Sequence, residues 1–183
     1  MKVLCVVGMP GSGKSRAMEF FRGKGVPVVN MGDAVREEAA RRGLPLSPEN
    51  LGTVARELRA RYGDEEVARR CAERIREGAE MSGLVVIEGI RSLQEVSYFK
   101  KNFPGEFLIL ALHANAEKRY ERLRARGRGD DPRDLKEFAE RDRRELDFGM
   151  GDAMALADLM IVNEGGEGEL EEGMERIYRM LRT

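Results

Sequence analysis

The chain has 183 residues with 42% hydrophobic and 36% charged residues, a composition typical of one globular domain with one core. Its formal net charge of −1 argues against a nucleic-acid-binding protein, and no apolar run approaches the roughly 20 residues that cross a bilayer. Two isolated cysteines exclude a disulfide framework or a zinc site and indicate a reducing compartment, so we expect a cytoplasmic protein.

Short apolar runs alternate with longer helical patterns along the chain. The runs are 3–7, 26–29, 84–87, 107–112 and 159–162. Because they are rich in Val, Ile and Leu and mostly do not alternate with polar residues, they predict parallel strands that are buried on both faces. The alternation of strands and helices predicts right-handed crossovers and one three-layer α/β/α domain over residues 1–183.

Amphipathic helical faces lie between these runs. Their apolar residues are Leu51, Val54, Ala55, Leu58 and Tyr62; Val67, Ala68, Cys71, Ala72 and Ile75; Leu135, Phe138, Ala139 and Leu146; and Leu170, Met174, Ile177, Tyr178 and Leu181. More than 50 residues separate the second and third strands, which predicts a helical insert over about 32–80, above the mouth of the sheet. The polar, glycine-rich stretch RARGRGDDPRD at 124–134 predicts a mobile lid.

The stretch GMPGSGKS at 8–15 matches the phosphate-binding pattern G-x-x-x-x-G-K-[ST], and it lies between a predicted strand and a helix predicted over 14–23. In such a loop the backbone amides and the helix N-terminus surround phosphate oxygens, the lysine reaches the β and γ oxygens, and the serine ligates Mg²⁺. The residues predicted to bind ATP or GTP with magnesium are Gly8, Met9, Pro10, Gly11, Ser12, Gly13, Lys14 and Ser15.

A bound triphosphate can serve a switch, a mechanical ATPase or a kinase. A GTPase switch usually carries N-K-x-D after a late strand, whereas NEGG at 163–166 lacks the lysine and the aspartate. A mechanical ATPase usually needs a larger module than 183 residues. A kinase needs acids and arginines at the strand ends, and a lid that excludes water. The sequence offers all three parts.

Two acid–arginine pairs follow predicted strands. Asp33 comes just after the second strand and Glu88 ends the third, with Arg36 and Arg91 three residues beyond them. Ligands of open α/β sheets bind beyond the carboxyl ends of the strands, so these pairs predict an anion site opposite the loop. The alternatives are that Asp33 caps a helix over 34–42 and that Glu88 forms a salt bridge with a nearby arginine.

Arginines also lead into the predicted lid. Arg119, Arg122 and Arg126 share one helical face that points toward the lid, and Arg128 lies inside it. The alternative is a solvated basic face. Asp131, followed by proline, is either part of the lid or the N-cap of the next helix. Of the arginines at 141, 143 and 144, one is placed to reach back to the phosphates.

Five segments in the same order resemble the nucleoside monophosphate kinase and dephospho-CoA kinase group: GMPGSGKS, NMGDAVRE, VVIEGIRS, RLRARGRGDDP and ADLMIVNEG. Over nearly its full length the chain resembles more closely an archaeal family of small nucleotide-kinase-like proteins with no assigned acceptor. The resemblance implies a sheet of five parallel strands in the order 2-3-1-4-5.

The resemblance also implies roles for single residues. GDAVR is similar to the adenylate-kinase segment whose arginine holds the acceptor's phosphate, which maps to Arg36. EGIR is similar to a stretch in which an acid supports Mg²⁺ and an arginine binds the acceptor, which maps to Glu88 and Arg91. RGRGDD is similar to the lid of UMP/CMP kinases, which implies Arg128 as a clamp on the transition state.

Dephospho-CoA kinases supply two further correspondences. ADLMIVNEG is similar to their last strand, whose following loop lies near adenine, which implies Asn163 and Gly165 at the nucleotide. Their base for the sugar hydroxyl follows the second strand, where this chain has Asp33. The chain departs from adenylate kinases by having Glu88 in place of aspartate and by lacking a proline in EGIR, and it departs from dephospho-CoA kinases by its G-D-x-x-R form.

These observations predict an ATP- and Mg²⁺-dependent kinase acting on a nucleotide or nucleotide-like small molecule. The alternatives are dephospho-CoA kinase itself, and a P-loop ATPase that works as a regulatory or assembly factor through a protein or RNA partner. The sequence sets no oligomeric state.

Overall fold

The structure is a computed structural model that describes residues 1–129 and 131–182, so Asp130 of the predicted lid and Thr183 lie outside the described residues. The elements are β1 (Lys2–Val7), α1 (Lys14–Gly23), β2 (Val28–Asn30), α2 (Gly32–Arg41), α3 (Pro48–Tyr62), α4 (Glu66–Ser82), β3 (Leu84–Glu88), α5 (Leu93–Asn102), β4 (Phe107–His113), α6 (Ala116–Arg126), α7 (Leu135–Asp147), α8 (Met150–Ala155), β5 (Leu159–Val162) and α9 (Glu167–Arg182).

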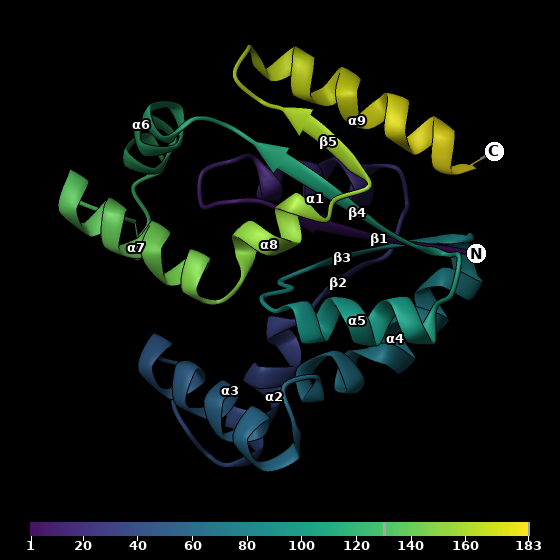
Figure 1. Ribbon diagram of the computed structural model, residues 1–183, viewed down its shortest axis with the longest axis vertical. Coiled ribbons are helices and arrows are strands. Elements are labelled where there is room, and N and C mark those ends of the chain that lie inside the picture. Colours follow the sequence, from purple (N-terminus) through teal and green to yellow (C-terminus); the bar gives the residue numbers. More distant parts are fainter. Residues whose placement is uncertain (130, 183) are drawn as a thin grey trace.

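The described strands form one five-stranded sheet in the order β2-β3-β1-β4-β5, and all pairs are parallel (Figure 1). This confirms the predicted α/β class and the strand order that the resemblance implied. β1 is the central strand, with Val3 opposite Val85 on one side and Phe107 on the other. The carboxyl ends of all strands therefore meet at one edge, where the 8–15 loop leaves β1.

Two apolar clusters fill the spaces on either side of the sheet. Val3, Cys5 and Val7 face a cluster that includes buried residues of α2, α3, α4, α5 and α8. Leu4 and Val6 face the opposite cluster, which α1 and α9 complete. Alternate residues of β1 are thus buried on opposite faces of the sheet, with helices on both sides. The predicted three-layer arrangement is therefore correct. Both cysteines are buried and free, as predicted.

Helices α2, α3 and α4 occupy the region predicted as an insert, between β2 and β3. Two predicted apolar faces are partly wrong. Tyr62 at the end of α3 is 45% exposed. On α7, Leu135 and Leu146 are 66% and 50% exposed, because α6 and α7 project from the sheet and only Phe138 of that face is buried (Figure 1). Phe138 packs on Tyr120 of α6, with ring centroids 5.4 Å apart.

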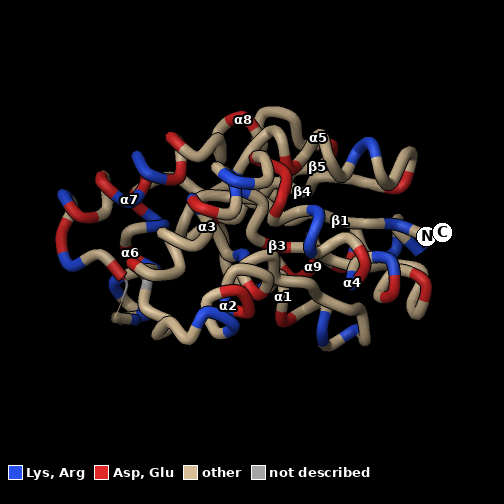
Figure 2. Tube along the Cα trace, turned by 90° about the horizontal axis from the view of Figure 1, so that it is seen from below, with Lys and Arg blue, Asp and Glu red and all other residues tan. Residues whose placement is uncertain are grey.

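The three helices of the insert are joined to one another by one carboxylate, which three arginines share. The Glu38 side chain of α2 is only 4% exposed, and it accepts hydrogen bonds from Arg41, Arg42 and Arg70 at 2.7–3.1 Å. Arg70 belongs to α4, and Arg42 also bonds Glu57 of α3. Hydrogen bonds from Arg41 and Arg42 hold the pKa of Glu38 well below its usual range. One ionised carboxylate thus links all three helices of the insert, and Figure 2 shows both signs of charge along α2.

We expect Glu38→Gln to lower the melting temperature by at least about 3 °C at pH 7, since three arginines lose their shared anion. A carboxyl group with a lowered pKa stabilises the fold above its unfolded-state pKa, near 4.5, and this contribution is lost as the pH falls below that value. The difference between the two proteins in thermal denaturation should therefore shrink between pH 7 and pH 3. Glu37→Gln, which removes a carboxylate that is 57% exposed, is the matched control and should change little.

Candidate active site

The 8–15 loop needs glycine because its neighbours approach its backbone closely. Gly11 has φ +82°, and a Cβ there would lie 2.7 Å from the carbonyl oxygen of Arg119 on α6. Gly13 has φ +109°, and a Cβ there would lie 2.5 Å from Nδ2 of Asn163. Both the left-handed backbone and the lack of space exclude larger residues. The loop is therefore packed between α6 and the end of β5.

Lys14 lies folded onto the loop, where it meets two carbonyl oxygens. Its Nζ donates to the carbonyl oxygens of Gly8 at 2.5 Å and Met9 at 3.1 Å. Burial lowers the pKa of Lys14 to about 8, and among the nearby charges Glu145 opposes this drop most. The ammonium group is thus held at the loop, which is the position from which a P-loop lysine meets phosphate oxygens.

The Arg119 side chain links the 8–15 loop to α7. Its guanidinium makes two hydrogen bonds to Asp142 of α7, at 2.8 and 2.6 Å, and donates to the carbonyl oxygen of Pro10 at 3.2 Å. It also lies over the ring of Phe138, 5.0 Å from the centroid. The expectation that Arg119 faces the lid is therefore wrong, because Asp142 pairs with it on the side of the loop tip.

Asn163, which the sequence placed at the nucleotide, follows β5 and lies beside the loop. It is 6% exposed, and its Nδ2 donates to the carbonyl oxygen of Ser12 at 2.9 Å. Its Oδ1 accepts a long bond of 3.4 Å from Arg122. The amide thus fastens the end of β5 to the loop, while Asn163 and Gly165 both border the adjoining cavity.

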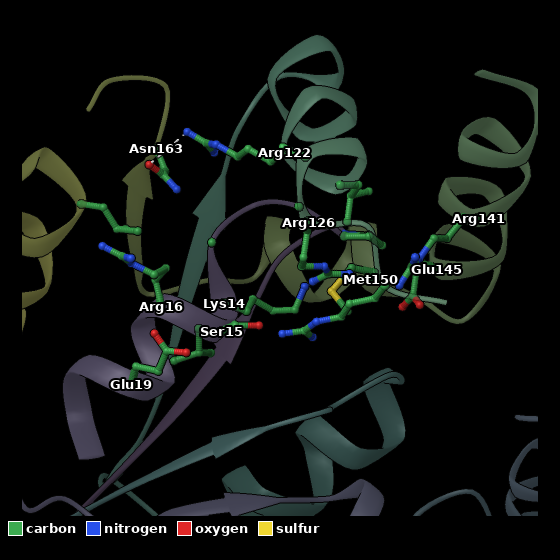
Figure 3. Close-up of a pocket in the computed structure, with 18 of the residues that line it drawn as sticks. Lys14, Ser15, Arg16, Glu19, Arg122, Arg126, Arg141, Glu145, Met150 and Asn163 are labelled. Atoms are coloured by element: carbon green, nitrogen blue, oxygen red, sulfur yellow. Dashed lines mark hydrogen bonds between the residues drawn. The ribbon is translucent and has the colours of Figure 1, made fainter. Parts of the chain in front are cut away.

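A cavity of about 870 Å³ opens on the loop. Among the described residues it is lined by seven cationic side chains, namely Lys14, Arg16, Arg91, Arg122, Arg126, Arg128 and Arg141, and by two acidic ones, Glu19 and Glu145. Figure 3 shows Lys14 and Ser15 from the loop and α1 facing Arg126 from α6, with Arg141 and Glu145 projecting from α7. Such an excess of positive charge favours a ligand that carries several negative charges.

The two predicted acid–arginine pairs differ in their position relative to this cavity. Asp33 and Arg36 bind each other through hydrogen bonds of 2.6 and 3.0 Å and, among the described residues, do not line it. Met31 precedes α2 at its N-cap, so the interpretation of Asp33 as a helix cap is wrong. Arg91 does line the cavity, and its guanidinium lies over the ring of Phe148.

Glu88 ends β3 next to the residues that line the cavity. Its Oε1 accepts from Nδ2 of Asn30 at 2.8 Å, and Oδ1 of Asn30 accepts from the backbone of Gly32 at 2.8 Å. The alternative of a salt bridge from Glu88 to an arginine is wrong within the described part of the chain, since the amide of Asn30 takes that place. This carboxylate is thus oriented by Asn30, at the end of β2, which in turn bonds the start of α2.

The predicted lid begins three residues later than expected, because α6 continues to Arg126. Asp131 accepts hydrogen bonds from Arg126 and from Arg141, which lies 3.2 Å away on α7. Hydrogen bonds from Arg126 lower the pKa of Asp131 to about 2. The interpretation of Asp131 as a helix cap is wrong, because Asp134 caps α7 by accepting from the backbone of Glu137 at 2.8 Å. Arg128 belongs to the cavity lining.

Sequence reasoning missed three residues of the cavity. Arg16 and Glu19 lie on α1 directly after the loop, and Glu145 lies on α7. Glu145 follows Arg141 by four residues, a spacing that places both on one face of a helix. That spacing predicts that Arg141 and Glu145 point the same way, but it does not predict which face of α7 lies toward the loop.

A P-loop between β1 and α1, the strand order 2-3-1-4-5 and arginines from α6 and α7 define a P-loop kinase-like fold. A family model described as an AAA domain matches residues 7–139. A UPF0200 protein from Thermococcus sibiricus is 47% identical over 180 residues, which are 98% of this chain and 95% of the relative. The chain belongs to the UPF0200 family.

Solved structures share the fold at low sequence identity. TT1252 from Thermus thermophilus has a TM-score of 0.66 at 21% identity, covering 100% of this chain and 98% of that one. Shikimate kinase from Bacteroides thetaiotaomicron has a TM-score of 0.58 at 15% identity, covering 100% and 99%. Over the described residues, no helix combines the length and the apolar character that a membrane span requires.

We expect Asp142→Ala to weaken nucleotide binding and to destabilise the fold by about 3 kcal/mol, because the Arg119 side chain, 7% exposed, loses its counter-charge. Isothermal titration with ADP and thermal denaturation measure the two effects. The control is Asp147→Ala on the same helix, since that carboxylate is 63% exposed and pairs only within α7. If both variants have the same ADP affinity and the same thermal stability, the ion pair between Arg119 and Asp142 does not support the loop.

Proposed function

We propose that the protein is an ATP- and Mg²⁺-dependent kinase that transfers the γ-phosphoryl group to a nucleotide or nucleotide-like small molecule. The observation that carries this proposal is the cavity on the P-loop, in which seven cationic side chains surround one space. They come from α1, the β3–α5 connection, α6, the α6–α7 segment and α7. Phosphoryl transfer depends mainly on positioning and on neutralising charge, and guanidinium groups from several elements supply both.

The donor triphosphate is assigned to the loop. The backbone of residues 8–15 and the N-terminus of α1 surround its oxygens, and Lys14 contacts the β and γ phosphates. Arg128, from the segment between α6 and α7, acts on the transferring group as a clamp. Asn163 and Gly165 border the cavity on the β5 side, where the nucleoside lies.

Magnesium fits the oxygen donors at the N-terminus of α1. The Ser15 side chain borders the cavity, and Glu88 ends the adjacent strand with its carboxylate oriented by Asn30. Mg²⁺ prefers oxygen ligands in octahedral geometry and keeps several waters, so one hydroxyl, one carboxylate and phosphate oxygens suffice. When bound, the ion neutralises charge on the phosphates.

The acceptor is assigned to the side of the cavity that faces α2 and the end of β3. Arg91 lines the cavity there, and Arg36 lies on α2, beyond the end of β2. Arg36 reaches an anionic acceptor only by exchanging its bonds with Asp33, which are formed between two side chains that are 41% and 49% exposed. Such an exchange is inexpensive at a half-exposed pair. In this assignment Asp33 and Arg36 contact the acceptor together.

Lys14→Ala tests the loop assignment. We expect turnover to fall below detection while the circular dichroism spectrum is unchanged, because the lysine contacts the triphosphate and contributes little to the core. ADP release in the presence of Mg²⁺ is the measurement. Activity within a few-fold of the parent protein would contradict the role of the loop.

An acceptor screen separates the kinase from the alternatives. The protein is incubated with ATP, Mg²⁺ and a panel of nucleotides, nucleosides, dephospho-CoA and sugar acids, and products are read by a mass gain of one phosphate. An acceptor that raises ADP release by orders of magnitude supports the kinase, and dephospho-CoA alone would narrow it to that activity. Slow ADP release that no acceptor changes would instead support an ATPase acting through a partner.

A further inference from the structure

Glu145 is a carboxylate on the lid side of the cavity. It lies in the last turn of α7, its side chain is 18% exposed, and it lines the cavity together with Lys14, Arg91 and Arg141. In Figure 3 the Glu145 and Arg141 side chains leave α7 on the same face and point into the pocket. Among the charged groups around Lys14, Glu145 does most to oppose the drop in the pKa of Lys14 that burial causes.

This carboxylate has no hydrogen-bond donor among the described residues. Its nearest cation, Nη1 of Arg91, is 3.8 Å away, which is beyond hydrogen-bond distance. The other acid that lines the cavity, Glu19 on α1, is exposed. Three acids beside the cavity are engaged: Asp131 by Arg126 and Arg141, Asp142 by Arg119, and Glu88 by Asn30. Glu145 therefore presents a hydrogen-bond acceptor to the cavity that a donor group of a ligand can meet.

The ligand group that suits Glu145 is a hydroxyl. A carboxylate repels phosphate oxygens, so Glu145 opposes nucleotide binding by the surrounding cations. A hydroxyl group donates a hydrogen bond to a carboxylate and has a proton to lose when its oxygen is phosphorylated. Asp33, the alternative acid, is engaged with Arg36 and lies outside the lining formed by the described residues.

We propose that Glu145 is the carboxylate that receives the proton of an acceptor hydroxyl, so that the product is a phosphate ester. The proposal rests on the kinase function proposed above. As the acceptor oxygen forms its bond to the γ-phosphorus, the bond from that phosphorus to the β,γ-bridging oxygen breaks. The electron pair of the broken bond leaves on the β-phosphate of ADP. The hydroxyl proton passes to Glu145 and then to water.

Three variants compare the candidate acids. They are Glu145→Gln, Asp33→Asn and, as a matched control, Glu140→Gln, which removes an exposed carboxylate on the same helix. Nucleotide affinity, measured by titration with ADP and Mg²⁺, requires no acceptor. Glu145→Gln should bind ADP as tightly as the parent protein or several-fold more tightly, because a repulsive charge is removed. Glu140→Gln should bind unchanged. A loss of affinity above tenfold in Glu145→Gln alone would mean that Glu145 supports the metal or the nucleotide, and would overturn the proposal.

Turnover with the acceptor found by the screen gives the second measurement. Glu145→Gln should lower kcat by about 10²–10⁴-fold with KM for ATP nearly unchanged, whereas Asp33→Asn should act mainly on KM for the acceptor. The reverse pattern would assign the proton to Asp33. Phosphorus NMR of the product identifies an ester or an anhydride: an anhydride would refute the role of Glu145 and leave the kinase intact, whereas no phosphorylated product with any acceptor would refute both.

Discussion

The position of β1 at the centre of the sheet is the constraint on which the rest of the structure depends. The strand is paired on both sides and buried on both faces, so its carboxyl end has one possible location, the middle of the sheet edge. The P-loop begins at that point, and every neighbouring strand ends beside it. Glu88, Asn30 and Asn163 come from different parts of the chain. The parallel register places Glu88 beside Val6 of β1 and Asn30 beside Glu88, while Asn163 bonds Ser12 of the loop.

The parts of the structure that the sequence predicted are those with a local signal. Continuous runs of Val, Ile and Leu predicted the strands to within about two residues, because a strand buried on both faces needs no polar alternation. The 8–15 loop was predicted because its glycines, lysine and serine occupy fixed positions between a strand and a helix. The apolar pattern of α7 failed because that helix leaves the sheet, so Leu135 and Leu146 have no core to enter.

The rest of the site depends on contacts between distant segments, which carry no local signal. Arg119 and Asp142 are 23 residues apart, and Asn163 is 151 residues from Ser12. The helical spacing of Arg119, Arg122 and Arg126 predicted one shared direction, but Asp142 binds the first of them at the loop tip. Asp131 resembled a helix cap in sequence, whereas in space two arginines surround it. Each difference arises because an ion pair formed across elements outweighed a local preference.

Acids partly neutralise several arginines in and around the cavity. Asp131 binds Arg126 and Arg141, and Asp142 binds Arg119. These carboxylates limit the repulsion among guanidinium groups that would otherwise disfavour the fold. A polyphosphate brings its own negative charge, so it acts as an alternative partner for the same arginines, and its arrival changes the charge environment of the whole lid side.

Arg119 has a consequence for how two ligands of this site affect each other. One guanidinium bonds both the Pro10 carbonyl group, at the loop, and Asp142, on the helix that carries Arg141 and Glu145. The loop and α7 therefore share a contact, so a displacement of one of them shifts the other. Thermodynamic linkage makes such an influence reciprocal: if a molecule bound against α7 tightens the loop's hold on a nucleotide by some factor, the nucleotide tightens the binding of that molecule by the same factor.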